Sequence, residues 1–467
     1  MYSYAYAKYS DVQKNRANAL LGEALKQQNQ LYPAKEDAIV IDNVFVRCNY
    51  CKTKLRFRFQ MGYFDIPFDI CCPTCGIHIS GLRKLEDEPL ITVDNATIFS
   101  GKPDEADYYA DFSVELPHAK IAKYESHEKL LESGFSPFMM TINLYGHETY
   151  LELVKRIQNF LSFKTSIWPQ LRPLFDLFAN GKINLAKDHF LNLSSRFAVE
   201  NELDGLMALH QTTVLGMNSI LPNGTLNEFM NAAKQINSPT IFTKLDNFFA
   251  ILGGKDHSIA LTKRLVNIYD RWMNDFEKYI PAIMLSLGNA IEKFDKARYG
   301  IATTSYEEMR TFYSDSYELI LDYIGIAIGL NNIIVRGDCN AFPSNTIRVN
   351  KTINCVSSFI DYLEIVKSSR LSLLVEDEPF GKAIPLNRNI RNAIAHFDCE
   401  FDASTQKITF RDKHRNKDNC VELYLVELAL LCYENMTMLA YFDELLYDLW
   451  KIYYLKEGMI LHIKASK

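Results

Sequence analysis

The sequence predicts a mainly α-helical protein that carries a small β-rich domain near its N-terminus. Two observations support this fold class. From about Ser136 onward, apolar residues recur at three- and four-residue spacing, which is the period of an amphipathic helix. Between Ala38 and about Ile121, the pattern consists instead of short runs rich in β-branched and aromatic residues, which is typical of strands. With 467 residues the chain is too long for one core, so we expect about two to four domains.

These patterns divide the chain into four segments. Residues 1–37 predict a polar, glutamine-rich helical segment that Pro33 ends. Residues 38–125 predict the β-rich domain, 126–300 a helical middle domain, and 301–467 a second helical domain that begins after Gly300. The expected strand runs are 39–41, 44–46, 55–59, 90–93 and 112–114.

Helical periodicity continues through the rest of the chain. It predicts helices over 148–163, 226–236, 259–276, 282–294, 306–335, 352–374 and 421–454, with a loop over 337–350 and a strand pair at 400–402 and 408–410. The most apolar stretch, 319–335, carries Asp322, Asn331 and Asn332. We therefore interpret it as a buried helix rather than a membrane span.

Composition restricts the functional classes. The formal net charge is −6, whereas a general nucleic-acid coat should be basic, so any nucleic-acid contact must be a local patch. The first twenty residues lack the basic start and apolar run of a signal peptide. We expect a cytoplasmic location, no membrane partner and no disulfides. Five of the ten cysteines are scattered among apolar neighbours and are interpreted as small buried hydrophobes, namely Cys339, Cys355, Cys399, Cys420 and Cys432.

The other five cysteines lie between residues 48 and 75. Two CxxC pairs, Cys48 with Cys51 and Cys72 with Cys75, are separated by about twenty residues, and Gly76 suits a tight turn after the second pair. This spacing predicts a tetrahedral thiolate site for Zn²⁺ in a zinc ribbon. Because four thiolates leave no open position, we expect the zinc to be structural. Cys71 could replace Cys72, although the spacing to Cys75 favours Cys72, and His78 is surplus.

The strand after the first pair alternates in character. Lys52, Lys54, Arg56 and Arg58 share one face, while Leu55, Phe57 and Phe59 share the other. The basic face is either a solvated strand surface or a ridge that contacts the phosphates of RNA or DNA. A protein partner would fit it as well.

A helix is predicted over 385–397, because Pro385 suits a first turn and an apolar stripe then follows at helical spacing. That stripe consists of Leu386, Ile390, Ala393, Ile394 and Phe397. Arg388, Asn392 and His396 lie away from it at four-residue spacing, with Arg391 on the same polar side. An arginine, an amide and a histidine supply a cation for phosphate, a polar aligner and a proton carrier. The alternative interpretation is a solvated helix face, although lysine and glutamate, which usually fill such faces, are missing.

Arg391, Asn392 and His396 resemble the R-N-x-x-x-H motif of HEPN-domain ribonucleases. The expected order of elements is similar as well, with helices before the motif and a strand pair and a long helix after it. The resemblance covers about residues 301–467, and the middle region matches no family that we recognise.

The resemblance implies a HEPN-like helical bundle that pairs into a homodimer or higher homo-oligomer, with two motifs forming one composite cleft. Such sites cut RNA without a metal ion, through attack of the 2′-hydroxyl on the adjacent phosphate. Arg391 would hold the phosphate, Asn392 would orient it or the imidazole, and His396 would move a proton. Many members of the family are toxins or anti-phage defence effectors, so a phage-derived trigger or an antitoxin is an expected partner.

Residues outside the motif are weaker candidates. Arg388 has no counterpart in the family motif and is proposed from helix geometry alone. Asp361 and Glu364 are either acidic helpers or ordinary surface charges. A basic loop after the strand pair is either an RNA contact or a solvated turn, and its candidate RNA-binding residues are Arg411, Lys413 and Arg415.

The leading hypothesis is therefore a metal-independent endoribonuclease. Phosphate-loop, Rossmann, zinc-protease and serine-hydrolase motifs are not found in the sequence. The alternative is a non-catalytic assembly protein whose zinc ribbon binds nucleic acid or protein and whose helical domain dimerises. A zinc-ribbon transcription-associated factor is a third hypothesis.

Overall fold

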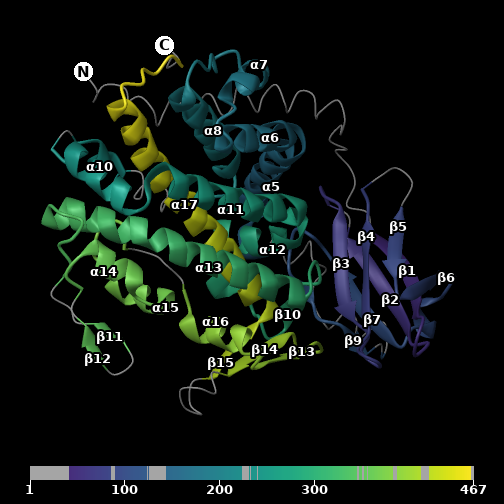
Figure 1. Ribbon diagram of the computed structural model, residues 1–467. Coiled ribbons are helices and arrows are strands. Elements are labelled where there is room, and N and C mark those ends of the chain that lie inside the picture. The colour runs from purple at the N-terminus through teal and green to yellow at the C-terminus, as the bar shows by residue number, and fades with distance from the viewer. Residues whose placement is uncertain are drawn as a thin grey trace.

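Figure 1 shows the computed structural model of the protein. It describes residues 41–463, with the exception of 61, 86–89, 124, 126–142, 223–230, 232, 239, 344–346, 350–351, 355, 382–385 and 412–419. The helical segment predicted over 1–37, and most of the helix predicted over 226–236, lie outside the described residues. We call residues 41–123 the β module and residues 143–463 the helical body, which stand side by side in Figure 1.

The β module contains two sheets. The larger sheet has the strand order β6-β1-β2-β7-β9, and the smaller has the order β3-β4-β5. Pair β1–β2 is antiparallel, whereas β2 and β7 run parallel. The strands are β1 (Ile41–Cys48), β2 (Lys54–Gln60), β3 (Ile66–Cys71), β4 (His78–Arg83), β5 (Ile91–Asp94), β6 (Ala96–Phe99), β7 (Tyr108–Phe112), β8 (His118–Ala119) and β9 (Ala122–Lys123), with a 3-10 turn η1 (Pro103–Glu105).

Aromatic side chains fill the core of the β module. Leu55, Phe57 and Phe59 on one face of β2 are fully buried, which confirms the apolar face predicted for this strand, but Arg56 on the opposite face is buried as well. The Phe57 ring lies 5.7 Å from that of Phe68 and 4.9 Å from that of Phe112. These rings join the two sheets through edge-to-face contacts, which add specificity to the burial of apolar area.

The helical body surrounds two long helices, α13 (Tyr306–Asn331) and α17 (Leu425–Lys456), which pack together through its centre (Figure 1). The preceding helices are α5 (His147–Ser162), η2 (Phe163–Ile167), α6 (Trp168–Ala179), α7 (Ile183–Leu193), α8 (Glu202–Met217), η3 (Lys234–Asn237), α10 (Phe242–Ile251), α11 (Gly254–Asn274), α12 (Phe276–Leu287) and η4 (Ile291–Lys293). In the sequence, β10 (Tyr299–Gly300) comes directly before α13. The elements between α13 and α17 are η5 (Asn332–Arg336), β11 (Ile347–Val349), β12 (Thr352–Asn354), α14 (Phe359–Glu364), α15 (Lys367–Arg370), η6 (Leu371–Leu373), α16 (Arg388–Ala395), β13 (Cys399–Asp402), β14 (Lys407–Arg411) and β15 (Cys420–Tyr424).

Helix α13 begins where its sequence dictates. The Ser305 side chain accepts a hydrogen bond from the backbone of Glu308, and the Glu308 carboxylate accepts one from the backbone of Ser305. This reciprocal cap satisfies two amide groups that a helix start leaves without partners. Both α13 and α17 are long and apolar enough to cross a membrane, but 78% of the apolar window of each is buried inside the protein. This burial supports the interpretation of the stretch 319–335 as a core helix.

Backbone pairing connects the β module to the helical body. Strand β8 pairs with β10, and the Asp69 amide donates to the Ala302 carbonyl oxygen at 2.7 Å. The Lys120 ammonium donates to the carbonyl oxygens of Lys296, Ala297 and Thr405 at 3.0, 3.0 and 2.5 Å. It also lies 4.3 Å from the centre of the Tyr424 ring. One lysine of the β module therefore contacts two separate segments of the helical body.

Several predicted elements were wrong in type or boundary. The helix predicted over 352–374 is instead strand β12 followed by the short helices α14, α15 and η6, and β12 pairs with β11, which lies in the loop predicted over 337–350. Thr352 and Ile353 are β-branched and pair across the hairpin, so strand propensity prevailed there. The helices predicted over 259–276 and 282–294 are α11 and α12, which divide at Asp275. The strand pair was confirmed, but β15 adds a third strand before α17.

Candidate functional site

The motif helix α16 is shorter than the sequence predicted. It spans Arg388–Ala395, because Asn387 caps its start and accepts hydrogen bonds from the amides of Asn389 and Ile390 at 3.0 and 3.3 Å. The prediction of a helix from Pro385 to Phe397 was therefore wrong at both ends. Asparagine competes for backbone donors, which favours a cap over an interior position.

The apolar face of α16 packs against β14 and α13. Ile390, Ala393 and Ile394 are 1%, 0% and 8% exposed, as the apolar stripe predicted. On the other side, Arg388, Arg391 and Asn392 are half-buried, and His396 at the C-cap is exposed. The structure therefore places the cation, the amide and the imidazole of the predicted motif on the outward side of one short helix.

Arg391 is held by a carboxylate that the sequence did not indicate. Its Nε and Nη2 atoms lie 2.8 and 2.6 Å from Glu318 Oε1 on α13, and its Nη1 donates to Asn392 Oδ1 at 3.4 Å. Both side chains of the pair are about one third exposed, at 29% for Arg391 and 33% for Glu318. The buried Tyr317 beside them has a raised pKa, chiefly because of burial, although Arg391 lowers it. Glu318 precedes Arg391 by 73 residues, so no local spacing could reveal this contact.

The acidic helpers considered from the sequence lie elsewhere. Asp361 accepts hydrogen bonds from the Ser357 amide and hydroxyl near the start of α14, at 3.2 and 2.5 Å. These bonds lower the pKa of its carboxyl group, which lies on the surface. Glu364 is exposed near the end of the same helix. Both positions fit ordinary surface and capping roles.

Phe397 corrects the predicted apolar stripe. Its side chain is 81% exposed, although the sequence placed it among the core residues of α16. Its backbone has a φ of +57°, which takes the chain out of the helix before its side chain can reach the core. The guanidinium carbon of Arg310 lies 5.9 Å from the centre of the Phe397 ring. An exposed aromatic ring and a cation thus adjoin His396.

Of the predicted RNA-binding residues, the structure describes Arg388 and Arg411. Arg388 is half-buried on α16 near the motif. Arg411, at the end of β14, is exposed but forms a two-bond ion pair with Glu400 at 2.8 and 2.9 Å. Lys413 and Arg415 lie outside the described residues.

Four cysteines of the β module form one cluster. The sulfur atoms of Cys48, Cys51, Cys72 and Cys75 all lie within 4.8 Å of one another, as the two CxxC pairs predicted. Cys48 and Cys75 are 3.7 Å apart, and Cys51 and Cys72 are 3.5 Å apart. This arrangement is consistent with a metal site. Sulfur atoms at these separations fit the corners of a tetrahedral thiolate site, and the donor set is complete without a fifth group.

Two similar turns present these sulfur atoms. The Lys52 amide donates to the Cys48 carbonyl at 3.1 Å, and the Gly76 amide donates to the Cys72 carbonyl at 2.8 Å. Both turn residues have a positive φ, +67° for Lys52 and +74° for Gly76. Gly76 suits this conformation, whereas Lys52 shows that the first turn forms without glycine.

Cys71 and His78 are not members of this cluster and line the cavity at the junction instead. His78 Nδ1 lies 2.8 Å from Asp69 Oδ1, and its Nε2 lies 3.8 Å from Cys71 Sγ. Hydrogen bonding to Asp69 raises the pKa of His78, and burial raises the pKa of Cys71 to about 11. The choice of Cys72 over Cys71 as a member of the cluster agrees with this geometry.

The basic face of β2 is partly neutralised within the β module. Arg56 donates to Asn43 Oδ1 at 3.1 and 2.9 Å, and Arg58 binds Asp111 at 2.5 and 2.7 Å. Lys54 lies 5.8 Å from the centre of the Phe99 ring. Because its two arginines already have protein partners, this face offers less charge to a phosphate chain than the sequence suggested.

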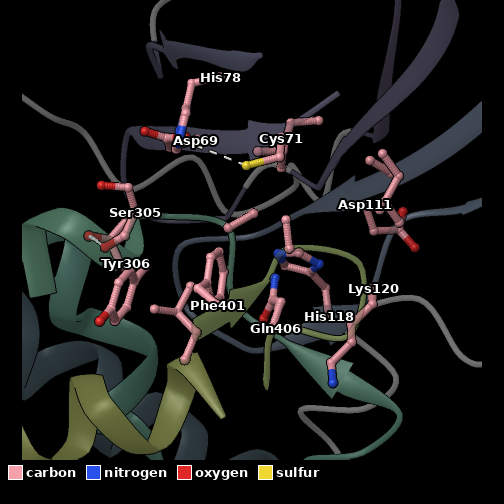
Figure 2. Close-up of a pocket in the computed structure, with 17 residues that line it drawn as sticks. Asp69, Cys71, His78, Asp111, His118, Lys120, Ser305, Tyr306, Phe401 and Gln406 are labelled. Carbon is pink, nitrogen blue, oxygen red and sulfur yellow. Dashed lines mark hydrogen bonds and ion pairs between the residues drawn. The ribbon is translucent and has the colours of Figure 1, made fainter. Parts of the chain in front are cut away.

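A small cavity lies where the β module meets the helical body (Figure 2). It measures about 40 Å³ and is lined by Asp69, Cys71, His78, His118 and Lys120 from one side and Tyr306, Phe401 and Gln406 from the other. Such a volume holds about one to three water molecules rather than a substrate. We therefore assign this cavity to the junction and not to catalysis.

Comparisons with known proteins give no match. No protein-family model matches the chain, no curated protein matches it in sequence, and no solved structure matches its fold.

Proposed function

We propose that the protein is a metal-independent endoribonuclease of the HEPN type, whose site is formed by Arg391, Asn392 and His396. The observation that carries this proposal is the outward face of α16, where a guanidinium, an amide and an exposed imidazole are presented while Ile390 and Ala393 anchor the opposite face. An exposed imidazole at a helix end is accessible to a polymer as large as RNA. A histidine that served only the core would be buried.

Each side chain has one task in this reaction. Attack of a ribose 2′-hydroxyl on the adjacent phosphate forms a 2′,3′-cyclic phosphate and releases a 5′-hydroxyl. Imidazole exchanges protons near neutral pH, so His396 can accept the 2′-hydroxyl proton or deliver one to the departing 5′-oxygen. Arg391 can stabilise the negative charge that grows on the phosphoryl oxygens. Asn392, in contact with Arg391 Nη1, orients that guanidinium.

Glu318 holds Arg391 before RNA binds. Its carboxylate contacts two of the guanidinium nitrogen atoms, which fixes the orientation of the guanidinium plane. The pair is about one third exposed, so water screens it and a phosphate can compete for the guanidinium. Glu318 is thus a positioning residue and not a proton carrier in this proposal.

A second copy of the chain completes the site. The reaction needs one group to take a proton from the 2′-oxygen and another to give a proton to the 5′-oxygen. A single imidazole cannot be a base and an acid at the same moment, whereas two motifs facing each other supply both. A homodimer that meets along α16 would place two histidines and two arginines around one phosphodiester.

The β module has a structural role in this proposal. The ligand set Cys48, Cys51, Cys72 and Cys75 would hold Zn²⁺, which these thiolates prefer, and the ion would stabilise the fold without entering the reaction. We also propose a cytoplasmic location, where thiols stay reduced, and a role as a toxin or defence effector that a trigger or antitoxin controls.

The Arg391–Glu318 ion pair also favours a second candidate function. If that pair persists when RNA is present, Arg391 is neutralised and the motif serves only a protein contact. The protein would then be a non-catalytic assembly protein whose β module binds nucleic acid or protein.

The decisive experiment is RNA cleavage by the full chain, compared with Arg391→Ala and His396→Ala. The matched controls are Arg196→Ala and His189→Ala, which alter exposed side chains far from α16 in sequence. We expect the wild type and both controls to produce 2′,3′-cyclic phosphate ends in EDTA, and both motif variants to lose at least a hundredfold in rate. Circular dichroism verifies that the helical body, which carries the motif, stays folded in EDTA.

Two results of the cleavage assay contradict the proposal. Cleavage that survives His396→Ala, or products that carry a 3′-hydroxyl, would assign the activity to other chemistry. If the wild type leaves RNA intact in the test tube, its toxicity on expression in cells is measured next. Toxicity that both motif variants retain would rule out the nuclease and favour the assembly protein.

A further inference from the structure

Helices α6, α12, α16 and α17 end with the same backbone pattern. In each, the backbone amide of the second residue after the helix donates a hydrogen bond to the carbonyl oxygen three residues earlier. The backbone amide of the following residue donates to the carbonyl oxygen five residues before it. The pattern requires a positive φ at the first of these donors. The residues there are Gly181 (+65°), Asn289 (+51°), Phe397 (+57°) and Gly458 (+81°).

Phe397 is the exception among these four. Glycine and asparagine adopt a positive φ at little cost, whereas a bulky side chain clashes with its own backbone there. Burial does not offset that cost, because the Phe397 side chain is 81% exposed. The backbone turn of α16 would form more readily with glycine, so the fold of this chain does not explain the benzyl group.

The surroundings of the ring indicate an anionic partner. The guanidinium carbon of Arg310 lies 5.9 Å from the centre of the Phe397 ring and 5.7 Å from the centre of the Tyr306 ring. In the part of the chain that the structure describes, no carboxylate pairs with Arg310. His396, the C-cap of α16, directly precedes Phe397 in the chain, and Arg391 lies within α16. An exposed ring beside an arginine is the combination with which proteins bind single-stranded nucleic acid, because bases stack on the ring and phosphates contact the cation.

We infer that Phe397 stacks against a nucleobase of single-stranded RNA next to the phosphodiester at the motif, and that Arg310 contacts a neighbouring phosphate. The inference rests on the proposed function, for which it adds a base-binding subsite. Stacking tolerates every base, so this subsite selects unpaired RNA over duplex rather than one sequence. A second copy of the chain is a less favourable partner for the Phe397 ring. A symmetric contact there would bring the Arg310 side chains of the two copies together with no anion between them.

The test measures RNA affinity in a His396→Ala background, so that the RNA stays whole. A fluorescent single-stranded RNA oligonucleotide of mixed sequence is titrated with that protein and with versions that also carry Phe397→Gly, Phe397→Tyr or Asn289→Gly. Phe397→Gly should weaken binding about 5- to 150-fold, the equivalent of about 1–3 kcal/mol of base stacking. Phe397→Tyr keeps the ring and should bind within about twofold, and Asn289→Gly, the matched change at the end of α12, should bind unchanged.

The melting temperature and the oligomeric state of the Phe397→Gly variant distinguish base stacking from misfolding and from a dimer contact. Phe397→Gly should melt no lower than its parent, because glycine relieves the backbone, so weaker binding cannot be attributed to misfolding. Unchanged affinity in Phe397→Gly, or a His396→Ala protein that binds no RNA, overturns the inference. Loss of a dimer in Phe397→Gly, measured by light scattering, would also overturn it and assign the ring to a copy contact. If ring-dependent binding persists although wild type never cleaves RNA, the proposed nuclease fails and the base subsite stands.

Discussion

The β module and the helical body are ordered by different means. The β module gathers four sulfur atoms within 4.8 Å and packs a small set of aromatic rings between its two sheets, whereas the helical body buries two long apolar helices in a large core. A small domain buries too little area to be stable on apolar contacts alone, so cross-links such as metal ions compensate. We therefore expect the two regions to unfold under different treatments. The β module should unfold when its cysteine cluster is disrupted, and the helical body when its apolar packing is disrupted.

The largest expected effect separates the two regions by metal loss. Cys72→Ser should abolish metal binding and unfold the β module, because structural thiolate sites contribute about 10–16 kcal/mol in small zinc domains. All three tryptophans, Trp168, Trp272 and Trp450, are buried in the helical body. Their fluorescence should therefore stay unchanged while elemental analysis shows the metal gone.

Cys71→Ser is the matched control for this variant, since Cys71 is adjacent in sequence but outside the cluster. It should retain one metal ion per chain. A Cys71→Ser protein without metal would show that the ligand set is wrong. A shift in tryptophan emission in Cys72→Ser would show that the helical body depends on the ion as well.

A smaller effect concerns the junction of the two regions. Lys120→Met removes the ammonium that donates to the carbonyl oxygens of Lys296, Ala297 and Thr405. Because hydrogen bonds from a charged donor contribute about 1.5–3 kcal/mol, we expect about 2 kcal/mol less stability at the junction. Hydrogen exchange should then be faster in β8 and β10, while the metal content stays the same. Lys123→Met, at an exposed position of β9, is the control, and equal exchange in both variants would exclude this role of Lys120.

The smallest effect is a pH dependence within the helical body. Asp322 on α13 pairs with Arg264 and Lys367. Burial alone would raise the pKa of Asp322, but these two partners lower it below the ordinary value of 3.8. A lowered carboxyl pKa stabilises the folded chain above the ordinary value, and the stabilisation disappears as the pH falls through the folded value.

Asp322→Asn should therefore cost about 1 kcal/mol at pH 6 and less at pH 3, because both partners are half exposed and water screens the pair. Urea denaturation followed by tryptophan fluorescence at the two pH values measures this difference. The metal should be bound equally in wild type and variant at pH 6. A cost that is equal at both pH values would indicate that the variant loses packing and not charge.

Sequence reasoning succeeded where the signal was local. The CxxC spacing predicted the four clustered sulfur atoms, and the alternation around Phe57 predicted the buried face of β2. The period of α16 predicted which of its residues are buried, apart from Phe397. It failed at 352–354, where apolar spacing suggested the start of a helix and backbone pairing produced one strand of a hairpin. Periodicity cannot distinguish these outcomes when a segment is short.

By itself, the sequence identified the four clustered cysteines at residues 48–75 and the polar residue types at 391–396, because the spacing within each motif is local. The tertiary structure decided what surrounds that chemistry. Glu318 reaches Arg391 only because α13 packs beside α16, and Arg310 meets Phe397 only because a cap turns the chain out of its helix. Contacts between residues about 70 or more positions apart depend on the packing of whole elements, which no local spacing encodes.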